Sequence, residues 1–262
     1  MKKKFATTIG GIAVSIAILS NTIGSVPTKA WSDSIANDII SMQDFLLGRS
    51  AGNNNAVDIF DLVQLRRSMA TNIIAGEIFL KNSSVIISEP GTYNVYGTLE
   101  DGQIIVDVDK NFYPDGEVKL ILNGITIKNS DDSPIYIKSV GDKCILELAD
   151  GTINTIEDGH TRSQLADVSS PNYEEMNGAI YSKDDLNIKG TGKLIVKANY
   201  KDGIVSKDDL KIKSGTIQVD AYDDALRGKD SVRIEDGNIT LMSSNGDGIK
   251  ATNDSNETKG FI

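Results

Sequence analysis

Carboxylates recur in the second half of the chain at a nearly constant spacing. Asp202, Asp224 and Asp247 each stand directly before a Gly or Ala, and Asp223 adds a second acid at one of these levels. In stacked repeats such side chains lie about 5 Å apart, where like charges repel by about 1 kcal/mol in water and by more near a protein surface. Calcium prefers carboxylate oxygens and would remove this repulsion. The spacing therefore predicts that these four residues hold calcium; turn chemistry, in which Asp accepts backbone hydrogen bonds, is the alternative.

Basic and aromatic residues accompany this acidic column. Arg227 and Lys250 each follow one of its acids by three positions, and Tyr200 and Tyr222 each stand shortly before one. An acidic polysaccharide would meet calcium through some carboxylates and Arg or Lys through others, while a tyrosine ring can stack on a sugar ring. We therefore predict that these four residues bind sugar, although solvated cations and half-buried tyrosines at a rim would give the same pattern.

Catalysis by a polysaccharide lyase is the alternative function. Calcium can acidify the proton next to a uronate carboxyl group, and Lys207, Arg227 or Lys250 would then remove that proton in a β-elimination. Such a base needs a depressed pKa, which no sequence motif demonstrates. The chain has a single Cys, Cys144, and a single His, His160, so His-based triads and Cys/His zinc sites are close to excluded. We expect a binding protein, with a surface adhesin or scaffold as a third alternative.

A repeat positions these residues. Three successive segments, NGAIYSKDDLNIKGTGKLIV, DGIVSKDDLKIKSGTIQV and DDALRGKDSVRIEDGNITL, share one pattern of three short alternating stretches. Aligning Gly178, Gly203, Ala225 and Gly248 gives offsets of 25, 22 and 23 residues. A period of about 20–50 residues indicates stacked repeats. Three short strands per turn predict an all-β fold, a parallel β-helix in which each turn pairs with the turn above it.

The repeat also predicts which positions face inward. The apolar positions should stack into three buried ladders, and the glycines between strands should adopt the left-handed backbone of tight corners. We expect a further column, which includes Arg227 and Lys250, to be exposed. The three ladders are Ile180, Ile204, Leu226 and Ile249; Leu186, Leu210 and Val232; and Leu194, Ile217 and Ile239. The corner glycines are Gly192, Gly215 and Gly237, and the exposed column is Tyr181, Val205, Arg227 and Lys250.

Residues 1–30 are typical of an export signal, with three N-terminal lysines, a short apolar run and the small-residue ending TKA. Its removal would take away four lysines and no acids, so the net charge would move from −10 to −14. Such a surface makes nucleic acid an unsuitable partner. The apolar run is shorter than the ~20 residues of a membrane span. We therefore predict a secreted or cell-surface protein without a membrane span.

Residues 31–75 show a different pattern. In NDIISMQDFLLGRSAG and VDIFDLVQLRRSMATN the apolar residues recur at helical spacing. Two such units resemble the helices of a dockerin, the duplicated calcium-loop module that binds a cohesin. Of the loop positions, only Asn54, Asp58 and Asp61 could still contribute ligands, too few for strong calcium binding. We predict a degenerate dockerin-like helical pair, which either binds a cohesin or merely packs on the next domain.

The order of the motifs in residues 76–262 carries a second resemblance. The run from GTYNVYGTLEDGQIIVDVD through VKLILNGITIKN and LADGTINTIEDG to the three repeats resembles the clostridial carbohydrate-binding β-helix family. This resemblance implies a right-handed coil related to polysaccharide lyases. It also implies calcium contact for the Asp column and calcium-assisted binding of plant cell-wall polysaccharide, either cellulose or acidic pectin-like glycans. Because Gly260–Ile262 look like the start of another strand, we expect that further rungs are missing after Ile262.

Overall fold

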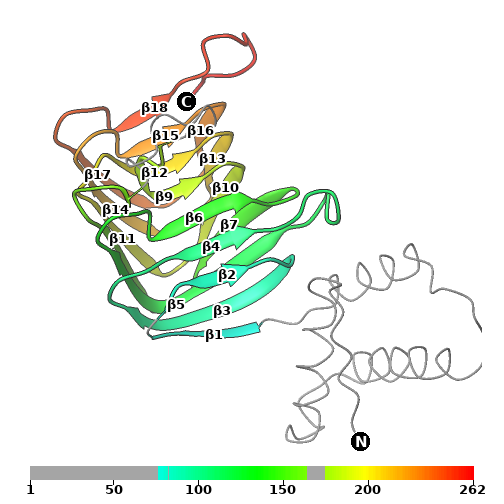
Figure 1. The fold of residues 1–262 in the computed structure, drawn as a ribbon. Helices are drawn as coiled ribbons and strands as arrows, with labels where there is room; N and C mark the ends of the chain where they lie inside the picture. The colour runs from blue at the N-terminus through cyan, green and yellow to red at the C-terminus, as the bar shows by residue number, and fades with distance from the viewer. Residues whose placement is uncertain (1–75, 82, 164–174) are drawn as a thin grey trace, which may run out of the picture. The chain divides into compact units, whose positions relative to one another are not determined.

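The described part of the chain is a coil of parallel strands that rises rung by rung (Figure 1). The computed structural model describes residues 76–81, 83–163 and 175–262, all of which belong to the second of two compact units, Asp58–Ile262. The expected export signal and dockerin-like helices lie outside the described residues. Within these ranges there is no α-helix, and thus no helix that could cross a membrane. The prediction of an all-β domain is confirmed.

Eighteen strands build this coil, and all of their pairings are parallel. The strands of the first rungs are β1 (Gly76–Leu80), β2 (Val85–Ile87), β3 (Gly91–Leu99), β4 (Ile104–Asp107), β5 (Val118–Asn129), β6 (Ile135–Ser139), β7 (Lys143–Leu148) and β8 (Ile153–Asp158). Those of the later rungs are β9 (Gly178–Ser182), β10 (Asp185–Gly190), β11 (Lys193–Ala198), β12 (Asp202–Ser206), β13 (Asp209–Ile212), β14 (Thr216–Ala221), β15 (Leu226–Gly228), β16 (Ser231–Ile234), β17 (Asn238–Ser243) and β18 (Ile249–Ala251).

The strands form two sheets, one of which is folded. The seven-stranded sheet has the order β18-β15-β12-β9-β6-β4-β2. The folded sheet has the order β16-β13-β10-β7-β5-β8-β11-β14-β17, and β3 and β1 continue it below β5. The first part of β5 pairs with β7 and its last part with β8, so this one long strand spans two faces. Three strands per turn are thus confirmed above β5, whereas below it a single long strand replaces two short ones.

The register of the rungs follows the repeat with one difference. Ile204 pairs with Leu226, and Leu226 pairs with Ile249, which agrees with the predicted offsets of 22 and 23 residues. One rung lower, Ile204 pairs with Ile180 and Asp202 with Gly178, an offset of 24 residues. The predicted offset of 25 between Gly178 and Gly203 is therefore wrong by one residue, because GAI in one repeat corresponds to DGI in the next.

The predicted inward ladders form the core. The first ladder is fully buried at Ile180, Ile204 and Leu226 and partly buried at its last member, Ile249. In the other two ladders only Ile239 is partly buried. Each buried aliphatic side chain stabilises the fold by about 1.5–3 kcal/mol, so stacking continuous columns stabilises every rung through its neighbours. Cys144 belongs to this core, and its burial raises the pKa of the thiol. This position excludes Cys144 as a nucleophile.

Two of the three predicted corner glycines have the expected backbone. Gly215 and Gly237 have φ angles of 118° and 124°, in the region that favours glycine. The prediction for Gly192 is wrong, because the positive φ of that corner lies at Gly190, with 111°. Gly192 is required for space instead: a Cβ there would lie 2.3 Å from the carbonyl oxygen of Ala149.

Candidate functional site

One corner of the coil carries a pocket of about 520 Å³, where β11 and β14 end. The register places Ala198 beside Ala221 and Ala221 beside Ser243, so the residues that follow these three positions emerge at the same corner of successive rungs. These three positions before the corner carry small residues, of which Ala198 and Ala221 are buried and Ser243 is half-buried, and they leave space for the larger side chains that follow. The pocket is lined by His160, Lys197, Ala198, Asn199, Tyr200, Asp220, Ala221, Tyr222 and Ser244.

Tyr222 supplies the exposed ring of this pocket. Its side chain is 55% exposed, although its backbone N–H is fixed by the carbonyl of Ala198 on the rung below. Charged and polar groups surround it, because Lys197 and Asp220 are register partners on β11 and β14. An aromatic ring beside a few polar groups is the composition of a sugar-binding site. The structure thus places the predicted residue Tyr222 in a pocket with this composition.

Tyr200 lines the same pocket but is held more tightly. The guanidinium carbon of Arg162 lies 4.4 Å from the centre of the Tyr200 ring, and the hydroxyl of Tyr200 donates a hydrogen bond to Glu175. The ammonium of Lys201 lies 5.4 Å from the same ring and also contacts Glu175, at 2.8 Å. Tyr200 is therefore a fixed wall of the pocket, with a cation over its ring, whereas Tyr222 is the ring open for stacking.

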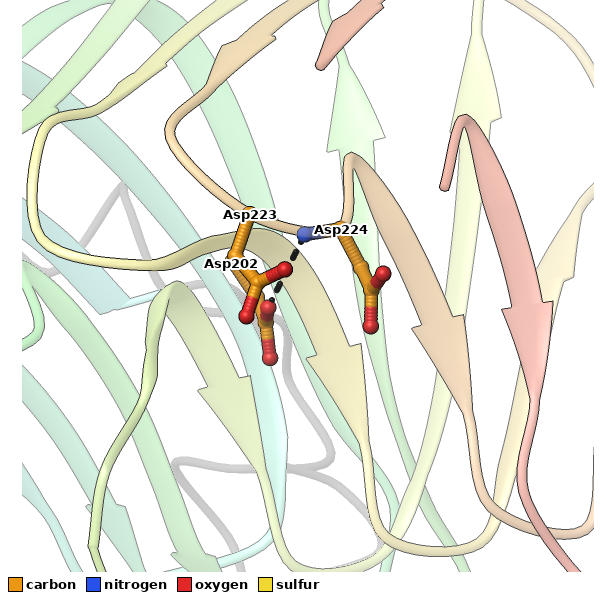
Figure 2. A group of neighbouring side chains, drawn as sticks. All are labelled: Asp202, Asp223 and Asp224. Atoms are coloured by element: carbon orange, nitrogen blue, oxygen red, sulfur yellow. Dashed lines mark hydrogen bonds between the residues drawn. The ribbon is translucent and has the colours of Figure 1, made fainter. Parts of the chain in front are cut away.

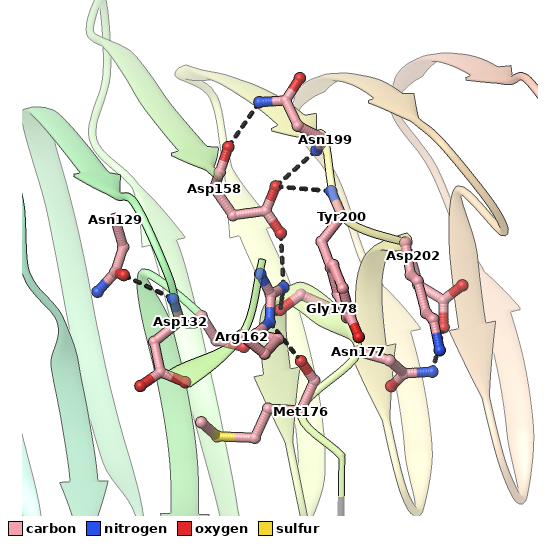
Figure 3. A network of polar contacts seen from close by, with 12 residues as sticks. Asn129, Asp132, Asp158, Arg162, Met176, Asn177, Gly178, Asn199, Tyr200 and Asp202 are labelled. Atoms are coloured by element: carbon pink, nitrogen blue, oxygen red, sulfur yellow. Dashed lines mark hydrogen bonds and ion pairs between the residues drawn. The ribbon is translucent and has the colours of Figure 1, made fainter. Parts of the chain in front are cut away.

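A buried ion pair holds this wall in place (Figure 3). Arg162 donates to Asp158 at 2.6 Å and to the carbonyl of Met176 at 2.7 Å, and both charged side chains are almost fully buried. The carboxylate of Asp158 also accepts the backbone N–H of Asn199 at 2.6 Å. Burial raises the pKa of Asp158, and the charge of Arg162 opposes this shift. The pair thereby fixes the chain where it enters the pocket.

Three of the four predicted calcium ligands meet next to this pocket. Asp202, Asp223 and Asp224 each offer a carboxylate oxygen within 4.8 Å of the others (Figure 2). Asp202 and Asp224 are buried and Asp223 is half-buried. The fourth, Asp247, is 63% exposed and lies outside this acidic cluster. It belongs to the outermost described rung, where β18 pairs with β15 alone among the described strands.

Each buried acid of the cluster is bound by the rung above it. Asp202 accepts the backbone N–H of Asp224 at 3.1 Å and the guanidinium of Arg227 at 3.1 Å. In the same way, Asp224 accepts the N–H of Asp247 at 2.9 Å and the ammonium of Lys250 at 3.0 Å. Burial raises the pKa of Asp202 to about 6, and Arg227 opposes this shift. Turn chemistry and ion pairing therefore neutralise the column in part without a metal.

The three clustered carboxylates are nevertheless the type of ligand that calcium prefers. Calcium takes 6–8 hard oxygen ligands at about 2.3–2.6 Å, and three carboxylates can supply up to six. One oxygen each of Asp223 and Asp224 converges on Gly246, where an added Cβ would lie 2.4 and 2.6 Å from them. Glycine is therefore required at position 246, because any side chain there would clash with both carboxylates. Lys250 is the competitor, because its ammonium occupies the carboxylate of Asp224.

Two of the three predicted catalytic bases, Arg227 and Lys250, are held as cations by the acidic cluster, and the third, Lys207, lies away from it. The hydrogen bond to Asp224 raises the pKa of Lys250, the opposite of what a base needs. Arg227 is held as a cation on Asp202, and a guanidinium does not lose its proton in proteins. Lys207 follows the far end of β12, about 16 Å along the strand from Asp202. The structure therefore does not bring Lys207 to the acidic cluster.

The prediction that Tyr181, Val205, Arg227 and Lys250 form one exposed column is wrong for its first two members. Tyr181 and Val205 are buried, and they pack with Met176 and the partly buried Tyr136 in a separate apolar cluster. Met176 belongs to the segment between β8 and β9, which has no counterpart in the other repeats. Only Arg227 and Lys250, with side chains 31% and 41% exposed, reach the surface as predicted.

Sequence reasoning missed several residues of the pocket. Asn199 and Ser244 line it because they follow register partners, and the repeated small residue before them is the signal that could have identified this corner. Lys197 and Asp220 could have been found from the same alignment. Asp158, the ion-pair partner of Arg162, lies only four residues earlier, but no local signal places this pair at the pocket, because Tyr200 and Met176 come from other segments of the chain.

A β-helix-like coil with an aromatic pocket beside an acidic cluster defines a class of proteins suited to polysaccharide binding. Residues 81–262 match the family described as carbohydrate-binding domain-containing protein, and the chain belongs to this family. A family relative from Acetivibrio thermocellus is 39% identical over 174 residues, which are 66% of this chain and 56% of the relative. The chain thus spans little more than half of that relative's length.

A solved structure shares the fold. It is a polysaccharide lyase-like protein from C. thermocellum, in a gadolinium derivative, with a TM-score of 0.64 and 37% sequence identity. The match covers 71% of this chain and 77% of that one. Membership of the carbohydrate-binding family and this structural likeness support polysaccharide binding in general.

Proposed function

We propose that this protein is a non-catalytic, secreted or cell-surface binder of plant cell-wall polysaccharide, and that it binds acidic pectin-like glycans with the help of calcium. The observation that carries the proposal is the exposed ring of Tyr222, set in a pocket directly before the acidic cluster in the chain. A sugar ring would stack on Tyr222, and its hydroxyls would bond to Asn199 and Ser244.

Calcium binding is the second part of this proposal. Asp202, Asp223 and Asp224 would hold the ion, whose remaining positions would accept the carboxylate of a sugar next to Tyr222. Arg227, on the partly exposed side of Asp202, would contact a further carboxylate of the polymer. Tyr200 and Arg162, which form the fixed wall of the pocket, would limit where the bound polysaccharide can lie.

The family membership and this geometry favour binding over a lyase reaction. The two cations nearest the cluster, Arg227 and Lys250, are paired with buried carboxylates and hold their protons. The export signal in residues 1–30 and the cohesin interaction of residues 31–75 complete the proposed role as separate parts. They would place the β-helix domain outside the cell and attach it to other proteins.

Calorimetric titration of metal-stripped protein with calcium, and then with polygalacturonate, tests the proposal. Asp223→Asn should weaken calcium binding at least tenfold, because it removes a ligand charge, whereas Asp247→Asn, in the same column but outside the cluster, should not. Tyr222→Ala should weaken polymer binding while calcium binding is retained, and Ile153→Ala, another exposed apolar residue, is its control. Equal effects of Asp223→Asn and Asp247→Asn would contradict the calcium site, and unchanged polymer binding by Tyr222→Ala would contradict the pocket.

A further inference from the structure

Two aromatic rings, the exposed Phe79 and the half-buried Tyr96, form a pair on the first rungs of the coil. Phe79 on β1 and Tyr96 on β3 are register partners, and their ring centres lie 5.3 Å apart at an interplanar angle of 42°. The side chain of Phe79 is 59% exposed. Five inter-strand steps of about 4.8 Å separate β1 from β14, so this pair lies roughly 24 Å along the coil from Tyr222. It is therefore distinct from the pocket and the acidic cluster.

The backbone beneath Phe79 is shaped to fit its ring. Gly97 has a φ of 100° and stands at a shift of register between β3 and β5. A Cβ at this position would lie 2.5 Å from the carbonyl oxygen of Leu80 and 3.0 Å from the edge of the Phe79 ring. Only glycine meets both conditions, so one edge of the Phe79 ring packs against bare backbone, which restricts the ring on that side. A ring that is restricted before binding loses less entropy when a ligand stacks on it.

A row of polar side chains runs beside the two rings. Glu77 and Asn94 stand two positions before Phe79 and Tyr96 on the same strands, and therefore point to the same outer face. The amide of Asn94 donates to the carboxylate of Glu77 at 3.0 Å, and its oxygen accepts from Asn123 of β5 at 3.4 Å. The row thus places hydrogen-bonding groups next to the two rings on the same face of the sheet.

We infer that these five residues, Glu77, Phe79, Asn94, Tyr96 and Asn123, form a second glycan-binding surface, here called the aromatic patch, whose ligand is a neutral polysaccharide. A pyranose ring has an apolar C–H face that suits Phe79 and hydroxyls at its rim that suit the amide and carboxylate row. The one charge of the patch is that of Glu77, which would repel a uronate. Binding at this surface therefore does not need calcium.

The size of the patch decides against a protein partner. Two aromatic side chains bury at most about 150–250 Å² each, whereas a stable protein interface needs about 800 Å² on each side. A single polysaccharide strand needs far less, because it makes repeated contacts along its length. This inference does not depend on the calcium site, since it uses other residues on other strands.

Affinity electrophoresis of the full chain through gels that contain hydroxyethyl cellulose, with a chelator present, tests the patch. Phe79→Ala should weaken retention about tenfold, and Asn94→Ala several-fold, because the ring and the amide row act together. Ile86→Ala, which removes a 67% exposed apolar side chain on the other sheet, should leave retention unchanged. If Phe79→Ala fails to fold, Phe79→Leu keeps the apolar volume without the ring and should lose most of the retention.

The same gels with polygalacturonate and calcium separate this inference from the proposed function. Phe79→Ala should retain wild-type binding to polygalacturonate, and Tyr222→Ala should retain wild-type binding to the neutral polymer. Wild-type retention of folded Phe79→Ala on the neutral polymer, or no retention of the wild type itself, would overturn the aromatic patch. If Tyr222→Ala loses only the calcium-dependent binding to polygalacturonate, the inference about the aromatic patch is unaffected.

Discussion

Replacing Arg227 by Met should destabilise the protein in a manner that depends strongly on pH. Asp202 is fully buried, and Arg227 is the cation that neutralises it, at 3.1 Å. Breaking a buried pair by removing one partner costs about 3–5 kcal/mol. Because the side chain of Arg227 is 31% exposed, we expect the lower end of this range for the charged form of Asp202. The neutral form of Asp202 needs no cation and should lose little.

The pKa of Asp202 sets the pH window of this effect. Burial raises that pKa from 3.8 to about 6 in the folded protein, so the native state binds the proton more tightly than the unfolded state does. A loss of about 3 kcal/mol for the charged form would raise the pKa of Asp202 further, because the proton then removes an unpaired buried charge. At pH 8 the substitution should therefore lower the free energy of unfolding by about 2–3 kcal/mol, and at pH 5 by well under 1 kcal/mol.

Urea unfolding at pH 5 and pH 8, with a chelator present, measures this difference. Arg233→Met is a matched control, because Arg233 is exposed on β16, outside the acidic cluster. Its free energy of unfolding should change by less than ~0.5 kcal/mol at either pH. A loss in Arg227→Met that is the same at both pH values would mean that Arg227 acts through packing. No loss at pH 8 would refute the neutralising role of the pair.

Three further predictions concern the same corner. As the pH rises from about 4 to about 6, the free energy of unfolding should fall by up to ~3 kcal/mol through Asp202 alone, because the raised pKa makes the folded state bind the proton more tightly than the unfolded state does. Asp202→Asn should remove this part of the fall in urea titrations across that range. An unchanged pH profile would contradict the raised pKa. Lys250→Met should strengthen calcium binding about tenfold in calorimetry, since it removes a cation that competes for Asp224; weaker binding would show that Lys250 does not compete. Arg162→Met should lower the free energy of unfolding by about 3–5 kcal/mol, because it leaves Asp158 buried and unpaired, and a double replacement with Asp158→Asn should recover part of this loss. Equal stability of the single and double variants would contradict the pairing.

The repeat made the coil predictable, because an apolar residue that recurs at each rung is a signal carried by the local sequence. The ladder of Ile180, Ile204 and Leu226 needed no more than this alignment. The register between Gly178 and Asp202 was less accessible, since a one-residue difference between repeats moves the alignment without changing the pattern. The long strand β5 was also unexpected, because a corner that bends without breaking a strand leaves no turn residues at its boundary.

The candidate site could be predicted only in its outline. The three clustered acids followed from the spacing, but the exposure of Asp247 depends on which strands lie above it. The burial of Tyr181 and Val205 depends on Met176, which lies in a segment outside the repeat. The ion pairs of Asp202 and Asp224 join each acid to a residue 25 or 26 positions later, and no local pattern within a single repeat reveals them.

These ion pairs have a consequence for how such an array can lengthen by gene duplication. Each duplicated unit would bring one basic side chain, which pairs with the acid of the rung below, and one acid, which pairs with the basic side chain of the rung above. Inserted copies would therefore preserve the charge balance. The lower boundary behaves differently. Gly178 takes the place of the acid there, and Val205, under Met176, takes the place of the base. A deletion that brought Arg227 to the position of Val205 would bury a cation without a partner, so the array can grow more readily than it can shrink.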